Sequence, residues 1–315
     1  MENLIFSLNA TMPIFLVMVA GYILRQIRMI DGSFVETLNS FNFKVTLPVL
    51  LLTDIAEADF YEVWDTKFVV FCFGVTLFCI LVIIVVSNLL VKDRGIKGEF
   101  IQASYRGSAA VLGVAFIQNI YGSSSIAPLM ILATVPLYNV AAVMILSFTA
   151  PGGTGLDREN LKKSLKGIAT NPIILGIFFG MIISVTRMEI PVIIGKTLHS
   201  FSQLATPLAL IGLGAAFEGR KALAKLKPTL ISSLIKLFVM PAIFLPIAAS
   251  LGFRNEKMVA ILIMLGAPTT VSCYIMSKNM GHEGILSSSC VVSTTLLSSV
   301  FITLWLYLMK TYGLI

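Results

Sequence analysis

Charged residues are scarce in this chain. Asp, Glu, Lys and Arg make up 12% of its 315 residues, whereas hydrophobic residues make up 57% and the mean hydropathy is +0.92. Soluble globular domains carry about 25% charged residues. The composition therefore excludes that class and predicts an all-α integral membrane protein.

The chain also lacks the motifs of ATP-driven and catalytic proteins. It has no P-loop, no connection long enough for a nucleotide-binding domain and no His/Cys/carboxylate group at metal-ligand spacing. The centres of its apolar runs hold neither paired carboxylates nor a Ser/His/Asp set. We therefore predict no ATP-driven step, no enzyme activity, no cofactor and no metal site. The net charge of +7 is divided among short loops, which reflects membrane topology better than a nucleic-acid partner.

Ten apolar runs are present, each close to the about 20 residues that a transmembrane helix needs. The first has no basic residue before it and no small-residue cleavage site after it, so we interpret it as a retained helix. The runs lie at about residues 4–24, 35–54, 67–91, 100–120, 125–149, 170–187, 191–215, 229–251, 257–278 and 284–309.

Helix-bending residues recur at a fixed separation of 159 positions, which indicates two copies of a five-helix unit, residues 1–155 and 156–315. Since five spans reverse the direction of insertion, the second copy must be inverted relative to the first. The matching pairs are Pro13 and Pro172, Gly21 and Gly180, Pro48 and Pro207, Gly107 and Gly266, and Gly122 and Gly281.

Loop charges predict the orientation. With the N-terminus outside, the cytoplasmic connections hold 14 Lys and Arg residues, and the outer connections with the C-terminus hold five. The outer 54–65 loop is instead acidic. The positive-inside rule thus predicts a multi-pass protein of the cell membrane with both termini outside the cytoplasm.

The stretch from Gly266 to Gly281, GAPTTVSCYIMSKNMG, predicts a broken ninth helix. Pro268 has no N–H to donate, and the hydroxyl groups after it can bond the backbone groups that the break frees. Broken backbone at this depth lines a cavity or is buried by protein, so a merely kinked structural helix is the alternative. In the fourth span, Ala109 stands where the ninth has Pro268, which predicts a weaker break there.

Several motifs in order resemble the auxin efflux carrier family, the bacterial relatives of plant PIN transporters. The resemblance implies ten helices in a fold of the bile acid:sodium symporter type, with helices 4 and 9 crossing at their breaks. It further implies organic anions as substrates, such as auxin or dicarboxylates. The motifs are LPVLLL after Asn39, PLYNV at 136–140, NPI at 171–173, TPLALIGLGA at 206–215 and APTTVS at 267–272.

The candidate substrate site is the meeting point of the two broken spans. Two half-helix N-termini that point into one cavity favour a carboxylate. Each hydroxyl group there is equally well explained by a hydrogen bond to its own helix. The candidates are Thr269, Thr270 and Ser272 beside Pro268 in the ninth span, Ser108, Ala109 and Gly113 in the fourth, and Asn39 and Asn139 as mid-depth amides that line the cavity or join helices.

Four basic residues lie within or near spans. Arg106 either binds a carboxylate in two-point fashion or extends to the cytoplasmic face. Lys44, one turn before Pro48, is a second candidate for the substrate's charge or for a cation that replaces a coupling ion. For Lys196 and Lys236, extension to a membrane surface is the favoured interpretation.

The predicted function is a secondary transporter of small organic anions that works by alternating access. The alternatives are an anion channel and a membrane-embedded receptor, although no output domain is present. Beyond the anion and the lipid bilayer, the sequence leaves open whether Na⁺, H⁺ or no ion is coupled, and whether the chain is a monomer or a homodimer.

Overall fold

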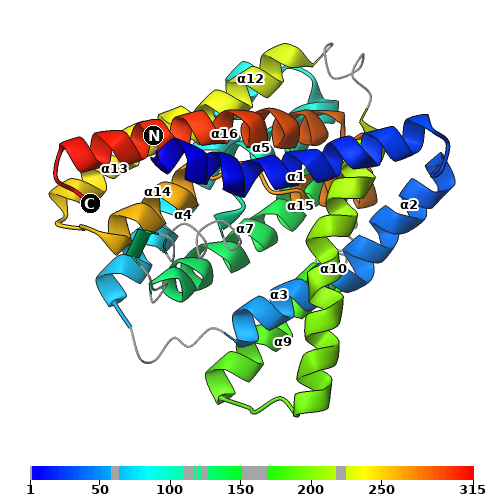
Figure 1. Ribbon diagram of the computed structural model, residues 1–315, viewed down its shortest axis with the longest axis horizontal. Coiled ribbons are helices and arrows are strands. Elements are labelled where there is room, and N and C mark those ends of the chain that lie inside the picture. The colour runs from blue at the N-terminus through cyan, green and yellow to red at the C-terminus, as the bar shows by residue number, and fades with distance from the viewer. Residues whose placement is uncertain are drawn as a thin grey trace.

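The computed structural model describes residues 2–57, 64–109, 117, 120–121, 126–150, 169–217 and 225–315, without the side chains of residues 2–11 and 14. This part of the chain is helical and contains no strand, so the predicted all-α class is confirmed for it. Helices α1 (Glu2–Gln26) and α16 (Ile285–Thr311) run side by side, and both chain termini lie at the same end of the molecule (Figure 1).

In the described residues the helices broadly coincide with the predicted apolar runs, but the second, eighth and ninth runs are each divided into shorter elements and the fourth is interrupted at residues 106–108. Two of the divisions are π-helical segments with continuous helical backbone on both sides. The elements between α1 and α16 are α2 (Gly32–Phe41), η1 (Asn42–Thr46), α3 (Leu47–Ala56), α4 (Thr66–Leu90), α5 (Arg94–Tyr105), α7 (Ala127–Thr149), α9 (Pro172–Thr186), α10 (Val192–Ala216), α12 (Leu226–Leu234), η2 (Ile235–Val239), α13 (Met240–Ser250), α14 (Glu256–Gly266) and α15 (Ser272–Asn279).

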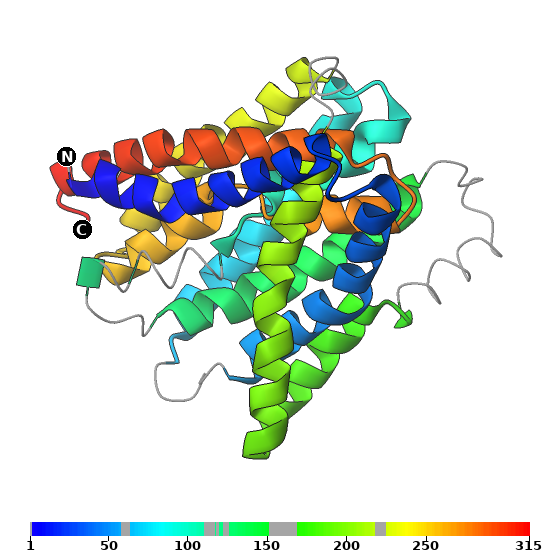
Figure 2. The same cartoon turned by 45° about the vertical axis from the view of Figure 1, so that its right-hand side comes forward.

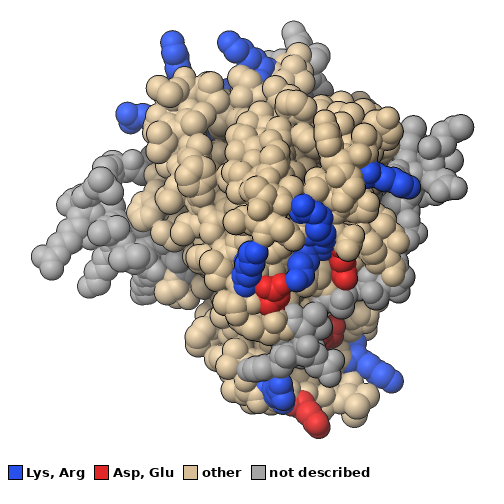
Figure 3. Space-filling model, turned by 90° about the vertical axis from the view of Figure 1, so that its left-hand side faces the viewer, with Lys and Arg blue, Asp and Glu red and all other residues tan. Residues whose placement is uncertain are grey.

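Helix α4 illustrates why this fold needs a lipid environment. Its side chains Val70, Phe78, Val85 and Leu89 are all more than half exposed. Contiguous apolar surface of this kind is rare on soluble monomers and is satisfied by lipid. By length and composition, four helical stretches in the described part of the chain can cross a membrane: Thr66–Leu90, Ala127–Thr149, Leu226–Ser250 and Ile285–Thr311. The end of the molecule in Figure 3 instead carries acidic side chains close to basic ones, as a face in contact with water does.

Two helices stop inside the protein, and their ends meet. Helix α14 ends at Gly266 and α15 begins at Ser272, with Pro268 in the non-helical residues between them. Helix α5 ends at Tyr105, and residues 106–108 are non-helical although no proline follows. The backbone N–H of Ser108 donates to the Pro268 carbonyl over 2.9 Å, so each interruption supplies a partner for the other. The break predicted in the ninth span is therefore present, and the fourth span has one at residues 106–108.

Two helix pairs pack with their backbones nearly in contact, α1 on α10 and α3 on α9 (Figure 2). A side chain added at Gly21 would meet the backbone of Ile211, and one added at Gly180 would meet the backbone of Leu52. The second contact is related to the first by the 159-residue separation, since Gly21 corresponds to Gly180 and Ile211 to Leu52. The packing of α1 on α10 is therefore repeated in that of α3 on α9.

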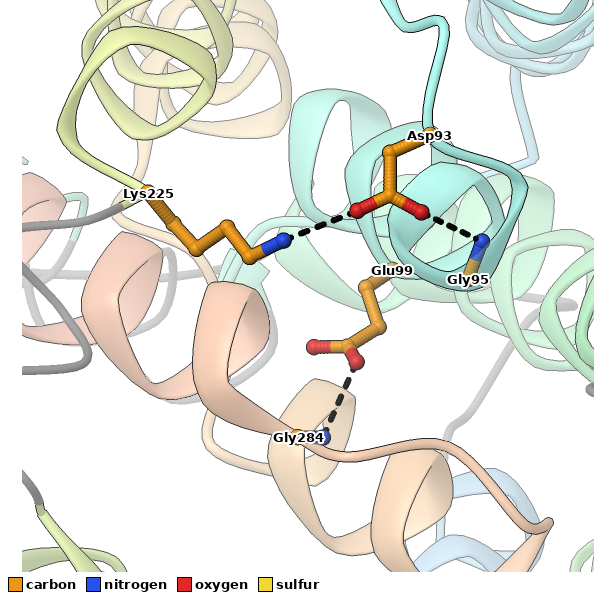
Figure 4. A network of polar contacts seen from close by, with 5 residues as sticks. All are labelled: Asp93, Gly95, Glu99, Lys225 and Gly284. Atoms are coloured by element: carbon orange, nitrogen blue, oxygen red, sulfur yellow. Dashed lines mark hydrogen bonds and ion pairs between the residues drawn. The ribbon is translucent and has the colours of Figure 1, made fainter.

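The carboxylate of Glu99, a fully buried residue of α5, caps the N-terminus of α16. It accepts a hydrogen bond from the backbone N–H of Gly284 over 2.9 Å (Figure 4). It also accepts hydrogen bonds from the backbone N–H of Ser287, over 2.8 Å, and from the Ser287 hydroxyl. Nearby, exposed Asp93 pairs with Lys225 over 2.8 Å. The hydrogen bonds from Lys225 and from the Gly95 backbone lower the pKa of Asp93 below its ordinary value.

We expect Glu99→Ala to destabilise the protein by about 3 kcal/mol, because three buried donors lose a charged acceptor. Lys225→Ala is the matched control. It removes only an exposed ion pair, so its effect is at most about 1 kcal/mol. Thermal unfolding of the purified protein in detergent compares the two variants. Equal effects would contradict the capping role of Glu99.

Candidate functional site

A cavity of about 150 Å³ lies where the two interrupted segments meet. Residues 106–109 and 268–272 form part of its wall, and α3, α7, α9, α10 and α16 complete it. A cavity of this size suits a small organic molecule better than a large one. The cavity is thus assembled from segments that are far apart in the sequence.

Most of the residues predicted for the site line this cavity. The interruptions bring the hydroxyl groups of the ninth span next to residues 106–109, and α7 adds an amide. Gly113 lies outside the described residues. The predicted residues on the cavity wall are Arg106, Ser108, Ala109, Asn139, Pro268, Thr269, Thr270 and Ser272.

Asn39 and Lys44 lie away from this cavity. Asn39 is buried, and its side-chain amide donates to the Tyr274 hydroxyl over 3.1 Å. Its backbone carbonyl accepts a hydrogen bond from the Asn279 side-chain amide, so Asn39 joins α2 to α15. Lys44 is exposed and lines a shallow groove with Glu36 and Ser40 on the outer face of α2 and η1.

The Arg106 side chain is buried and points into the wall between α7 and α15. Its Nη2 donates to Asn139 Oδ1 over 2.7 Å and to Ser272 Oγ over 2.9 Å. Its Nη1 contacts Met276 Sδ at 2.8 Å and Gln102 Oε1 at 3.5 Å. The side chain is only 2% exposed, so it does not extend to the membrane surface.

The guanidinium of Arg106 has no anionic partner in the described part of the chain. Its side-chain contacts are neutral, and its Nε is buried without an acceptor there. A buried charge without an ion-pair partner is costly. An anion bound in the cavity would offset that cost.

The comparison with protein families gives the class of the chain. Residues 6–306 match the model of the family described as membrane transport protein. The chain belongs to that family. The prediction of a transporter related to the auxin efflux carriers is confirmed at this level, and a membrane location fits it.

Two curated transporters are similar to this family member over nearly their whole length. One, from Rhizobium meliloti, carries the provisional name of malonate transporter and is 23% identical over 313 residues, 96% of each chain. The other, from Methanothermobacter thermautotrophicus, is named an uncharacterized transporter and is 21% identical over 300 residues, 95% of this chain and 97% of its own. Neither relative is named as an enzyme.

The hydroxyl groups of this transporter's ninth span divide into two sets. Thr269 is buried, its Oγ1 donates to the Ala103 carbonyl over 2.9 Å, and its backbone N–H donates to Thr294 Oγ1. Thr269 therefore secures the break to α5 and α16. Thr270 and Ser272 are half-buried and lie 3.2 Å apart at the cavity wall. Of the three residues, these two are the less buried.

Tyr138, at mid-depth in α7, lines the cavity and donates its hydroxyl to the Met264 carbonyl over 3.1 Å. The sequence interpretation did not anticipate two features in and beside this transporter's site. Asp54, assigned to an outer loop, lies in α3 on the cavity wall. Lys236, expected to extend to a membrane surface, is instead fully buried, so that interpretation was wrong. A lysine flanked by apolar residues gives no indication from sequence of which carbonyl groups surround it.

Proposed function

We propose that the chain is a secondary transporter of small organic anions and binds a dicarboxylate of malonate size at the crossing of its two interrupted helices. The observation that carries this proposal is Arg106, buried on the cavity wall without an anionic partner in the described part of the chain. Its fork of N–H donors matches a carboxylate. The name of the Rhizobium meliloti relative supports the same substrate class.

The second carboxylate of such a substrate would meet polar groups at the start of α15. The first N–H groups of a helix have no partners within that helix and carry partial positive charge. Helix α15 begins at Ser272, and Thr270 precedes it on the same wall. Backbone N–H groups of its first turn already donate to the carbonyls of Thr270 and Val271. Arg106 and the hydroxyls of Thr270 and Ser272, at the positive end of this helix, would therefore hold the two carboxylates of one small dianion.

The proposed transport mechanism rests on an inverted repeat of five helices, with ten spans in a fold of the bile acid:sodium symporter type. The repeated contacts Gly21 with Ile211 and Gly180 with Leu52 support the repeat. The paired interruptions near residues 107 and 268, and the termini at one end of the molecule, also fit it. Alternating access would then move α3, α9 and α10 relative to the crossing around the bound anion.

We expect malonate to raise the thermal unfolding midpoint of the purified protein in a saturable way, whereas uncharged malonamide, of nearly the same size, leaves it unchanged. Ligand that binds only the folded state stabilises by about 2.7 kcal/mol at a hundredfold excess over Kd. Longer dicarboxylates and auxin-like acids tested in parallel define the size limit. If no organic anion stabilises the protein, the proposed substrate class is wrong.

Flux into proteoliposomes separates a carrier from a channel. A carrier gives saturable malonate uptake that malonate on the opposite side accelerates. Flux that does not saturate and does not respond to malonate on the opposite side would indicate an anion channel.

A further inference from the structure

The C-terminal ends of the two interrupted helices converge on one buried ammonium group. Lys236, in η2, is fully buried. Its Nζ donates to the carbonyl of Tyr105, the last residue of α5, over 3.0 Å. It also donates to the carbonyl of Met264, in the last turn of α14, over 3.2 Å. One side chain therefore bridges both helix ends.

The C-terminal ends of helices attract cations because their carbonyl groups carry partial negative charge. The last four carbonyls of a helix have no partners within it, and together they carry a charge of roughly −0.5. Two such ends have a combined charge of about −1, which a single monovalent cation balances. Broken membrane helices with exposed carbonyls bind sodium ions or protons in this way.

Lys236 lies directly behind the wall of the anion cavity. A methyl group on Gly107, which lines the cavity, would lie 2.9 Å from Nζ and 3.3 Å from the Ala267 carbonyl. In the described part of the chain no carboxylate pairs with this ammonium group. Its hydrogen bonds go to backbone carbonyls at the crossing of the two interrupted helices. Its positive charge therefore stabilises these helix ends, which lie next to the cavity wall.

We propose that the ammonium group of Lys236 permanently occupies the cation position of the helix crossing, so that the protein needs no inorganic cation there to hold the crossing together or to bind its anion. The part concerning the anion rests on the proposed function above, whereas the part concerning the crossing does not.

The test compares thermal unfolding of the full chain in sodium chloride and in N-methyl-D-glucamine chloride at equal concentration, without substrate. The wild type is expected to unfold at the same temperature in both. Lys236→Ala should unfold roughly 5 °C lower or more in N-methyl-D-glucamine, because the Tyr105 carbonyl loses its donor and the Met264 carbonyl keeps only that of Tyr138. Lithium, sodium or potassium should restore much of that loss in a saturable way, by entering the vacated position.

Two further variants test whether the loss of stability and its rescue by cations are specific to the position vacated by the Lys236 ammonium group. Lys44→Ala removes an exposed lysine from η1, the other π-helical segment, and should behave as the wild type. Lys236→Met removes the charge but fills the space, so it should be destabilised without being restored by cations. Saturable sodium stabilisation of the wild type, or a destabilised Lys236→Ala that no monovalent cation restores, would overturn the proposal.

A second measurement applies if Lys236→Ala does not fold. Calorimetric titration of the wild type with malonate should give the same Kd in sodium and in N-methyl-D-glucamine, and a Kd that depends on sodium would overturn the proposal. The two proposals fail separately. Absence of malonate binding contradicts the anion site alone, because cation rescue of Lys236→Ala is measured without substrate.

Discussion

Arg106→Gln is expected to weaken malonate binding by at least about 100-fold, because loss of one partner of a buried ion pair costs about 3–5 kcal/mol. The unliganded protein should not be destabilised. In the described residues the guanidinium is buried without a counter-ion, and its Nε lacks an acceptor. Glutamine can keep a hydrogen bond to Asn139 or Ser272 while it removes the buried charge.

Weaker malonate binding without loss of stability distinguishes a residue that binds the substrate from one that only supports the structure. A residue that only holds helices together loses stability when it is replaced, whereas one that carries strain for function loses function and keeps or gains stability. Arg106→Lys should also bind malonate weakly, because an ammonium group cannot reproduce the planar fork. Lys44→Gln, at an exposed position outside the cavity, is the matched control and should bind as the wild type.

Isothermal titration with malonate gives the affinities, and thermal unfolding without ligand gives the stabilities. If Arg106→Gln binds malonate as the wild type does, Arg106 does not bind the substrate. If it binds weakly only because it is partly unfolded, its unliganded midpoint will be lower than that of the wild type, which would indicate a structural role instead.

We also expect a large loss of folding stability for Gly21→Val and for Gly180→Val. At both positions a side chain would point into backbone atoms of the neighbouring helix, which cannot move aside as the end of a flexible side chain can. Overpacking costs about 1–3 kcal/mol where side chains can adjust. We expect more than this, with loss of most folded protein, because the helices themselves must separate.

Gly74→Val is the control for these substitutions. Gly74 is exposed on α4, and an added side chain there meets no atom within 4 Å. Its effect should stay within about 0.5 kcal/mol. The yield of monodisperse protein and its unfolding midpoint report the result. If Gly21→Val and Gly180→Val behave as Gly74→Val does, the close contacts α1 with α10 and α3 with α9 do not exist as described.

The break in the ninth span was predictable because its cause is local. A proline inside an apolar run removes a donor wherever the run is placed, and the hydroxyl residues beside it indicate polar surroundings. The fourth span was harder to judge. Its break is secured by groups from elsewhere, namely the Pro268 carbonyl for the Ser108 N–H and Lys236 for the Tyr105 carbonyl. No feature of residues 100–120 encodes those partners.

By itself, the sequence determined the membrane environment, the helical class and the segment where the ninth span breaks, because hydropathy and proline chemistry act over a few residues. Only the tertiary structure decided which polar residues share the cavity. Asp54 and Arg106 line the cavity wall. Asn39 instead links two helices, and Lys236 donates to the carbonyls of two helix ends. The physical reason is that a buried polar group needs partners, and in this fold those partners come from spans distant in the chain.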